Sequence, residues 1–286
     1  MSYYIALFFS KIFCLLSAGF CRSLGDFLGT LTWPIVPQKR KRLAKDQIQF
    51  CLKVSGQEAE RIAKKSWTRF GSMFIEVMRF PVMKNHIEKY VKIEGRENME
   101  KGLALGCGGI IATAHSGNWE LLGAALALSG FPIVGVAMKQ KEAGLDRFIN
   151  DYRRLVGMHV TYKTGVREMF SMLKEGWIIG LLMDQDASRH DGILLEFFGR
   201  VTNCVQGPAS LARFKAAPIF PTFITQNEDG THTLIIHKPV FVEKTQDKHE
   251  DIRRTTAVLT KIIEDHIRKY PEEWFWLHDR WKSVRK

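Results

Sequence analysis

The sequence has few of the features that mark zinc, redox or disulfide-bonded proteins. Its five cysteines are scattered, and no pair has the short spacing of a zinc or thiol–disulfide motif. An odd, scattered set is a poor disulfide framework. We therefore expect reduced cysteines that act as small apolar fillers, and a soluble part that faces the cytosol. The five are Cys14, Cys21, Cys51, Cys107 and Cys204.

Long apolar runs are also missing, because no uninterrupted run reaches the roughly 18–20 residues of a clear spanning helix. Residues 3–36 are nevertheless rich in Phe, Leu and Ile, and the basic run Lys-Arg-Lys-Arg follows at residues 39–42. This pattern predicts a membrane-associated N-terminal segment, residues 1–42. The segment either spans the bilayer or lies in its interface, and a hydrophobic hairpin buried in the fold is the alternative. If it spans, the basic run leaves the rest of the chain on the cytoplasmic side.

Acidic residues are in deficit, since 30 Asp and Glu against 42 Lys and Arg give a formal net charge of +12. A surplus of that size favours a polyanionic partner: nucleic acid, an anionic membrane or a phosphorylated substrate. The sequence lacks zinc spacing, an RNA-recognition signature and a basic zipper, and its start is apolar, so we do not expect nucleic acid as the partner. With 286 residues, 45% of them hydrophobic and 25% charged, the chain is globular and long enough to bury a sizeable core.

Apolar runs alternate with helical patterns after residue 90, which predicts an α/β fold with a mostly parallel central sheet covered by helices. One catalytic domain, residues 43–286, would follow the N-terminal segment. Residues 43–90 are expected to be helical until Pro81. We expect strands at residues 91–94, 109–114, 132–137, 177–183, 219–225 and 233–242. We expect helices at residues 118–128, 144–155, 166–174, 206–216 and 252–270.

The most informative stretch is residues 114–120, Ala-His-Ser-Gly-Asn-Trp-Glu. An apolar strand ends there and a helix begins, and ligands bind at the carboxyl ends of strands in α/β sheets. We expect His115 on the loop and Glu120 in the first helical turn, with Gly117 permitting their close approach. Glu120 would accept a hydrogen bond from one imidazole nitrogen, and the other nitrogen would take a proton from an acceptor hydroxyl. The helix N-terminal amides would hold a phosphate or an oxyanion. From spacing alone, a structural histidine remains an alternative.

The stretch from His115 to Glu120 resembles the active-site motif of the bacterial lipid A biosynthesis acyltransferases, the late lauroyl and myristoyl transferases. They belong to the wider lysophospholipid acyltransferase group, whose motif is His, four residues, then Asp or Glu. The resemblance extends over nearly the whole chain. Its further blocks are Asp-Gln-Asp at 184–186, Phe-Phe-Gly-Arg at 197–200, Gly-Pro-Ala at 207–209, Ala-Pro-Ile-Phe-Pro at 217–221, Pro-Glu-Glu-Trp-Phe-Trp at 271–276 and Asp-Arg-Trp-Lys at 279–282.

The resemblance implies a glycerolipid acyltransferase-like fold at the bacterial inner membrane, with the catalytic domain on the cytoplasmic side. It implies a fatty acyl donor on acyl carrier protein, or less often on coenzyme A, and no further cofactor. The implied acceptor is a hydroxyl of a phosphorylated lipid A precursor. His115 and Glu120 would be the catalytic pair, and Arg153 would hold the anionic substrate, with Arg154 as the alternative register. The other expected substrate contacts are Gly117, Asn118, Asp184 and Arg200.

Three features of the sequence allow other interpretations. Asp184 and Asp186 lie two apart without a nearby ligand cluster, which is a thin metal signal, so no metal is expected and a loop-shaping or substrate-orienting role is favoured. Ser116 lacks the Gly-x-Ser-x-Gly elbow of a nucleophilic hydrolase, which favours direct transfer without a covalent enzyme intermediate. A glycerophospholipid or glycolipid acyltransferase with the same machinery is the alternative function. Glu120 favours the lipid A branch, because glycerolipid acyltransferases mostly carry Asp there.

Overall fold

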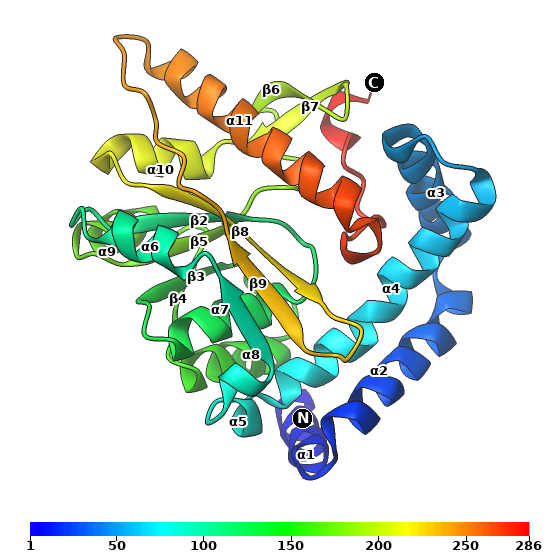
Figure 1. Cartoon of the computed structure of the whole chain (residues 1–286). Helices are drawn as coiled ribbons and strands as arrows, with labels where there is room; N and C mark the ends of the chain where they lie inside the picture. Colours follow the sequence, from blue (N-terminus) through cyan, green and yellow to red (C-terminus); the bar gives the residue numbers. More distant parts are fainter. Residues whose placement is uncertain (286) are drawn as a thin grey trace.

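The computed structural model describes residues 1–285 and has the predicted α/β architecture (Figure 1). The helices are α1 Ser2–Leu15, α2 Ala18–Thr32, α3 Gln38–Leu52, α4 Gly56–Met78, α5 Phe80–Met83, α6 Arg96–Leu103, α7 Trp119–Leu128, α8 Ala143–Leu155, α9 Val166–Lys174, α10 Gly207–Lys215 and α11 Lys248–Lys269. Short 3₁₀ turns are Trp33–Ile35, Ile87–Lys89, Pro271–Glu273 and Lys282–Val284. The strands are β1 Val91–Glu94, β2 Gly109–Thr113, β3 Ile133–Ala137, β4 His159–Tyr162, β5 Ile178–Leu182, β6 Gly192–Phe197, β7 Arg200–Val205, β8 Ile219–Gln226 and β9 His232–Ile236.

A mostly parallel sheet forms the centre of the molecule, with strand order β1-β9-β8-β2-β5-β3-β4. Strands β8, β2, β5, β3 and β4 run parallel to one another, whereas β9 is antiparallel to β8 and pairs in parallel with β1. The central strand β2 is buried along its whole length between β8 and β5. Its apolar, unalternating sequence is typical of a strand covered on both faces.

Most expected elements are confirmed within a few residues, and the differences have physical causes. The strand expected at 233–242 ends at Ile236, because Pro239 lacks the N–H that a continuing ladder requires. Beyond it, Val240 makes only an isolated bridge to Ile219. The short helix α6, strand β4 and the β6–β7 hairpin were not predicted. These are short elements with weak periodicity.

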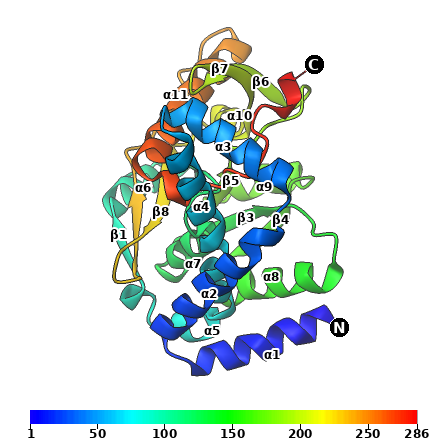
Figure 2. The ribbon, with the colours of Figure 1, turned by 90° about the vertical axis from the view of Figure 1, so that its right-hand side faces the viewer.

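Residues 3–36 form two helices rather than one, separated at Ser17, whose hydroxyl caps α2 by accepting a hydrogen bond from the Phe20 amide. No helix within residues 1–285 is both long enough and apolar enough to cross a bilayer. Both helices pack on the rest of the chain: α1 lies against α8, and α2 runs along the outer side of α4 (Figures 1 and 2). The division of the chain at residue 42 stays a prediction.

Small residues bring α2 and α4 into backbone contact. A Cβ atom on Gly25 would lie 2.4 Å from the Ser72 Cα, and one on Gly71 would lie 2.0 Å from the Gly25 carbonyl oxygen. No larger side chain fits at these positions without moving a helix. The Ser72 hydroxyl also donates a hydrogen bond of 2.9 Å to Asp26 on α2. The two helices therefore form a closely packed pair.

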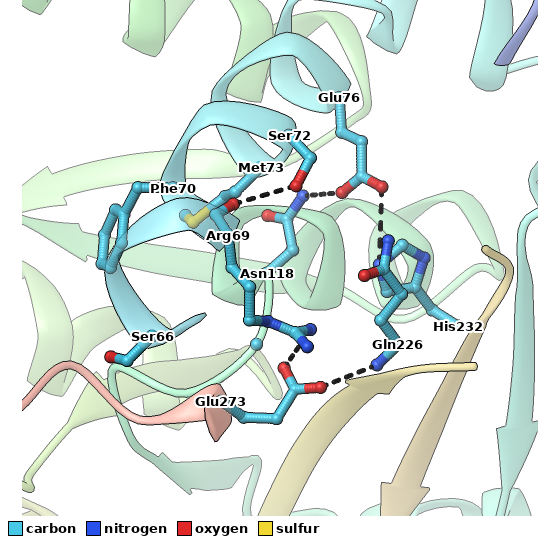
Figure 3. Close-up of a pocket in the computed structure, with 11 residues that line it drawn as sticks. Ser66, Arg69, Phe70, Ser72, Met73, Glu76, Asn118, Gln226, His232 and Glu273 are labelled. Atoms are coloured by element: carbon cyan, nitrogen blue, oxygen red, sulfur yellow. Dashed lines mark hydrogen bonds and ion pairs between the residues drawn. The ribbon is translucent and has the colours of Figure 1, made fainter. Parts of the chain in front are cut away.

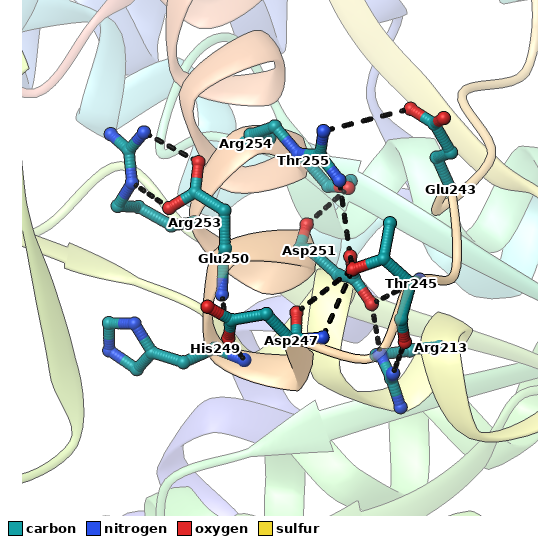
Figure 4. A network of polar contacts seen from close by, with 10 residues as sticks. All are labelled: Arg213, Glu243, Thr245, Asp247, His249, Glu250, Asp251, Arg253, Arg254 and Thr255. Atoms are coloured by element: carbon teal, nitrogen blue, oxygen red, sulfur yellow. Dashed lines mark hydrogen bonds and ion pairs between the residues drawn. The ribbon is translucent and has the colours of Figure 1, made fainter.

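Polar contacts fix the beginning of α11 (Figure 4). Asp247 caps the helix by accepting hydrogen bonds from the amides of His249 and Glu250. The buried Asp251 accepts from Thr245 in the preceding loop and from the Arg213 guanidinium on α10, at 2.6 and 2.8 Å. These contacts tie α11 to α10 and to the loop before it, so the far end of α11 is held at a fixed place behind the loop that follows β2.

Candidate active site

Strand register brings His115 and Asp184 together. In the parallel pair β2–β5, Thr113 lies opposite Leu182, and the Met183 amide donates a 3.0 Å hydrogen bond to the Thr113 carbonyl. His115 and Asp184 each follow these paired residues by two positions, at the carboxyl ends of adjacent strands. Equal offsets from a parallel register place two side chains at the same edge of the sheet.

The His115 imidazole is bound by the Asp184 carboxylate. The His115 Nδ1 and the Asp184 Oδ1 are 2.9 Å apart, and the other Asp184 oxygen accepts a 2.7 Å hydrogen bond from the Trp274 indole. The Asp184 side chain is 1% exposed and that of His115 is 24% exposed. Nδ1 is therefore held inside the protein, and Nε2 is left as the nitrogen that a substrate can reach.

Opposing effects act on the Asp184 carboxyl group. Burial alone raises the pKa of Asp184, but the charge and hydrogen bond of His115 and the hydrogen bond from Trp274 outweigh it, so its pKa lies below the ordinary value. Asp184 is thus an ionised carboxylate beside the imidazole ring. Both Asp184 oxygens are bonded to protein groups, and the expected contact of Asp184 with substrate stays a prediction.

Glu120 has a different partner from the one expected. No hydrogen bond joins it to His115 within residues 1–285. Its two carboxylate oxygens accept bonds of 2.8 and 2.6 Å from the Nε and Nη2 atoms of Arg153. A bidentate guanidinium is a stronger partner than a neutral imidazole, which is the physical reason for the difference. Arg153 also donates from Nη1 to Asn150, which leaves N–H groups on Nη1 and Nη2 for a ligand.

Gly117 and Asn118 shape the loop. Gly117 has a φ of 62°, and a Cβ atom there would lie 2.1 Å from the Ile224 carbonyl oxygen. The Asn118 side chain is buried: its oxygen accepts from the Leu121 amide and caps α7, while its nitrogen donates 2.7 Å to Glu76 on α4. The contacts of both residues shown here are made within the protein, and the expectation that they bind substrate stays a prediction.

Arg200 is not brought to this loop. It lies on β7, where its guanidinium is 5.9 Å from the Phe50 ring centroid and 5.5 Å from that of Trp281, and it lines a separate hollow. Asp186 accepts hydrogen bonds from the amide and hydroxyl of Ser283, so it shapes the C-terminal loop as expected. No group of three or more metal-ligating side chains is found within residues 1–285.

An apolar cavity of about 60 Å³ extends from the Glu120–Arg153 pair under α7. Its floor is one face of the sheet. Thr113 and Leu182 lie near residues 114–118, which we name the catalytic loop, and Ile111 and Gly180 lie two residues further from that loop along the strands. The inner end has two more glycines and a methionine. The Met158 methyl group lies close to both glycines: it would be 2.7 Å from a Cβ atom on Gly123 and 3.1 Å from one on Gly135. We name this cavity the apolar slot.

A second hollow adjoins the C-terminal segment. It has a volume of about 430 Å³ and is bordered by the segment after α2 and by the C-terminal segment. The latter segment contacts the loop directly, because the Phe275 amide donates a 3.0 Å hydrogen bond to the His115 carbonyl. The hollow is lined by Ile35, Val36, Pro37, Arg40, Trp67, Phe275, Leu277 and His278.

Comparison with known proteins gives a consistent assignment. The phosphatidylinositol mannoside acyltransferase of Mycolicibacterium smegmatis is 26% identical over 226 residues, covering 77% of this chain and 72% of that protein. The lipid A biosynthesis palmitoleoyltransferase of Escherichia coli is 21% identical over 264 residues, covering 91% and 84%. The lipid A biosynthesis lauroyltransferase of the same species is 23% identical over 263 residues, with the same coverage.

Among solved structures, the 1-acyl-sn-glycerophosphate acyltransferase of Thermotoga maritima has a TM-score of 0.39 at 14% identity, over 86% of this chain and 97% of that chain. A likeness of that size adds nothing to the assignment. The model of the family described as "Bacterial lipid A biosynthesis acyltransferase", in contrast, matches residues 1–283. The chain belongs to the bacterial lipid A biosynthesis acyltransferase family.

Proposed function

We propose that this acyltransferase moves a fatty acyl chain from a thioester, on acyl carrier protein or coenzyme A, to a hydroxyl of a phosphorylated lipid A precursor at the inner membrane. The observation that carries the proposal is the buried Asp184 carboxylate on Nδ1 of His115, which leaves Nε2 free at the strand edge. An alcohol is a weak nucleophile at neutral pH, so acyl transfer needs a base at this place.

In the proposed reaction, the His115 Nε2 takes the proton of the acceptor hydroxyl as its oxygen attacks the thioester carbonyl. The tetrahedral intermediate then collapses, the carbon–sulfur bond breaks, and the leaving thiolate takes the proton from the imidazolium. The ionised Asp184 stabilises the imidazolium in between. We expect the oxyanion to lie toward the first-turn amides of α7, where the helix dipole favours negative charge.

The apolar slot suits the acyl chain of the donor. Its mouth lies at Trp119, whose ring centroid is 5.0 Å from that of His115, and its walls are aliphatic. A cavity of about 60 Å³ is too small for a whole fatty acyl chain, so the chain must displace Met158, a flexible side chain that repacks easily. In the proposal, the Glu120–Arg153 pair orients the donor at the mouth, and the remaining N–H groups of Arg153 bind an anionic group.

The acceptor is proposed to approach through the second hollow, where Arg40 adds a positive charge beside apolar side chains. This hollow adjoins helices with an exposed apolar face. On α2, Phe27 and Leu31 are 62% and 61% exposed, while Gly25 and Gly29 on the opposite face are buried. An exposed apolar helix face beside the basic residues 39–42 is the pattern of a helix that lies in a membrane interface.

A phosphorylated glycolipid of another class is the second candidate acceptor. The Mycolicibacterium relative, named as a phosphatidylinositol mannoside acyltransferase, has the higher identity, although the Escherichia coli relatives cover more of this chain.

Purified enzyme with a thioester donor should acylate the lipid A precursor faster than a phosphatidylinositol mannoside or lysophosphatidic acid, as measured by mass spectrometry of the three products. Preferential acylation of either other acceptor would replace the lipid A assignment.

Loss of the base should remove turnover without unfolding the protein. We expect His115→Ala to lower kcat at least about a hundredfold, because the hydroxyl proton then has no acceptor. Asp184→Asn keeps the shape but removes the charge that stabilises the imidazolium, and we expect a loss of at least about tenfold. Steady-state kinetics with circular dichroism as the fold control measures both. A folded His115→Ala variant with normal turnover contradicts the proposal.

Shortening the side chain at the end of the slot should change the preferred acyl chain. Met158→Ala opens space next to Gly123 and Gly135, so we expect kcat/KM for a donor four methylenes longer to rise about tenfold relative to the wild-type preference. Met172→Ala is the matched control, since Met158 and Met172 are 7% and 8% exposed and only Met158 lines the slot. Equal shifts in the two variants, or none in Met158→Ala, would exclude the slot as the acyl site.

Charge on the exposed face of α2 should weaken membrane binding. We expect the double variant Phe27→Asp, Leu31→Asp to bind vesicles containing phosphatidylglycerol at least about tenfold more weakly in a sedimentation assay, because carboxylates are costly in an apolar interface. The control is Phe241→Asp, whose side chain is 50% exposed on a loop remote from α2. Unchanged sedimentation of the double variant would argue against this face. Point variants are preferable to a deletion, because α2 packs closely on α4.

A further inference from the structure

A buried polar cluster lies behind the catalytic loop, on the side that the proposed mechanism does not use (Figure 3). Arg69 and Glu76 contribute to it from α4. Their spacing of seven residues is close to two helical turns, so both point from the same face of the helix. Figure 3 shows Asn118 from the loop, Glu273 from the C-terminal segment, and Gln226 and His232 from the sheet arranged around them.

This cluster is costly to bury. Burial raises the pKa of Glu76 to about 7, an effect that Asp26 on α2 increases and that Asn118, Arg69 and Arg22 reduce. Burial also raises the pKa of Glu273, which forms an ion pair with Arg69. His232, 3.6 Å from Glu76, is kept neutral, because burial lowers its pKa to about 4. Apolar residues of similar volume would serve stability at least as well, so a polar cluster here calls for a reason other than stability.

One side of the catalytic loop is held by Glu76. Its Oε2 accepts a 2.7 Å hydrogen bond from the Asn118 Nδ2, and the Asn118 Oδ1 caps α7. Asn118 comes three residues after His115, and α7 carries Glu120 in its first turn. A change in the orientation of Asn118 therefore alters both the path of the loop and the start of the helix.

Arg69 holds the other side through the C-terminal segment. Its guanidinium forms an ion pair with Glu273, whose carbonyl accepts a 3.0 Å hydrogen bond from the Gly117 amide. Two residues later, the Phe275 amide binds the His115 carbonyl, and Ser116 and Trp274 form a β-bridge between these bonds. The loop thus lies against a short strand-like segment that Arg69 fixes to α4.

Helix α4 is itself held firmly. Its backbone contacts α2 at Gly25 and Gly71, and the Ser72 hydroxyl, which lines the cluster, donates a hydrogen bond to Asp26 on α2. A helix that is fixed beside the cluster and connected to both sides of a loop is a rigid support for that loop.

We propose that Glu76 and Arg69 are positioning residues that set the place of His115, Glu76 by its hydrogen bond to Asn118 and Arg69 by its ion pair with Glu273. The proposal rests on the proposed role of His115 as the base. A displacement of about 1 Å at a base costs about a hundredfold in rate, so these contacts need only prevent a small shift. Neither residue lines the apolar slot or the second hollow.

The test compares three α4 variants. Glu76→Ala removes the hydrogen bond to Asn118 and should lower kcat at least about tenfold while the KM for donor and acceptor stays within about twofold. Glu76→Gln keeps an oxygen that accepts from Asn118, and should restore kcat to within about threefold of wild type. Glu60→Ala is the control: it removes a contact of the same helix outside the cluster, to Lys45 on α3, and should leave kcat unchanged.

The melting temperature of Glu76→Gln, measured at two pH values, checks that this variant is folded. The ordinary pKa of Glu76 is 4.5 and the folded value is about 7, so ionising Glu76 lowers stability as the pH rises between these values. Glu76→Gln has no such loss, so its melting temperature should exceed that of the wild type at pH 8 and equal it at pH 5.

Hydrogen exchange gives a readout that needs no substrate. Amide exchange in residues 114–121 should accelerate in Glu76→Ala and in Arg69→Ala but not in Glu60→Ala. If His115 proved not to be the base, exchange would still report whether these residues hold the loop. Normal kcat in Glu76→Ala, equal losses in Glu76→Ala and Glu76→Gln, or unchanged exchange in the loop would each overturn the proposal.

Discussion

The hydrogen bond between the buried Asp184 carboxylate and the His115 Nδ1 is the interaction on which the rest of the site depends. It fixes which imidazole nitrogen faces outward, and it keeps a negative charge beside the ring that, in the proposed mechanism, takes up a proton on Nε2. A buried carboxylate is tolerated only with partners, and the Trp274 indole supplies the second one. Both partners are set by the fold: the imidazole by the parallel register of β2 and β5, and the indole by the C-terminal segment that runs along the loop.

Three parts of the structure around this hydrogen bond have different proposed roles. In the proposal, the sheet edge presents the base and the apolar slot under α7 holds the acyl chain, while α2 presents an apolar face near the basic residues 39–42. Helix α4 contacts α2, and it reaches the loop that follows β2 through Glu76 and through the Arg69–Glu273 ion pair. Its buried polar residues therefore connect the part of the molecule proposed to meet lipid with the part that carries the proposed base.

The sequence predicted the fold class and the position of His115 well, because long apolar strands and helix boundaries leave clear local signals. It did not predict the partner of His115. Glu120 lies close in the chain and belongs to a recognisable motif, whereas Asp184 is 69 residues away and is brought close only by strand register. The signal was nevertheless present: each residue follows an apolar strand at the same offset, which is significant once those strands are known to be parallel neighbours. Gly117 and Asn118 were expected to bind substrate because they too lie close to His115 in the chain and belong to the same motif. Their contacts lie on α4, β8 and the C-terminal segment, and no periodicity in the sequence indicates them.

The most direct test of the account is the tautomer of His115, measured by nitrogen-15 NMR on histidine-labelled enzyme without substrate at a pH where the ring is neutral. We predict that Nδ1 carries the proton and is bonded to the carboxylate, that Nε2 is bare, and that this preference is lost in Asp184→Asn. A neutral ring protonated on Nε2, or a tautomer that is unaffected by Asp184→Asn, would contradict the account, because the nitrogen facing the substrate could then not accept the proton of a hydroxyl.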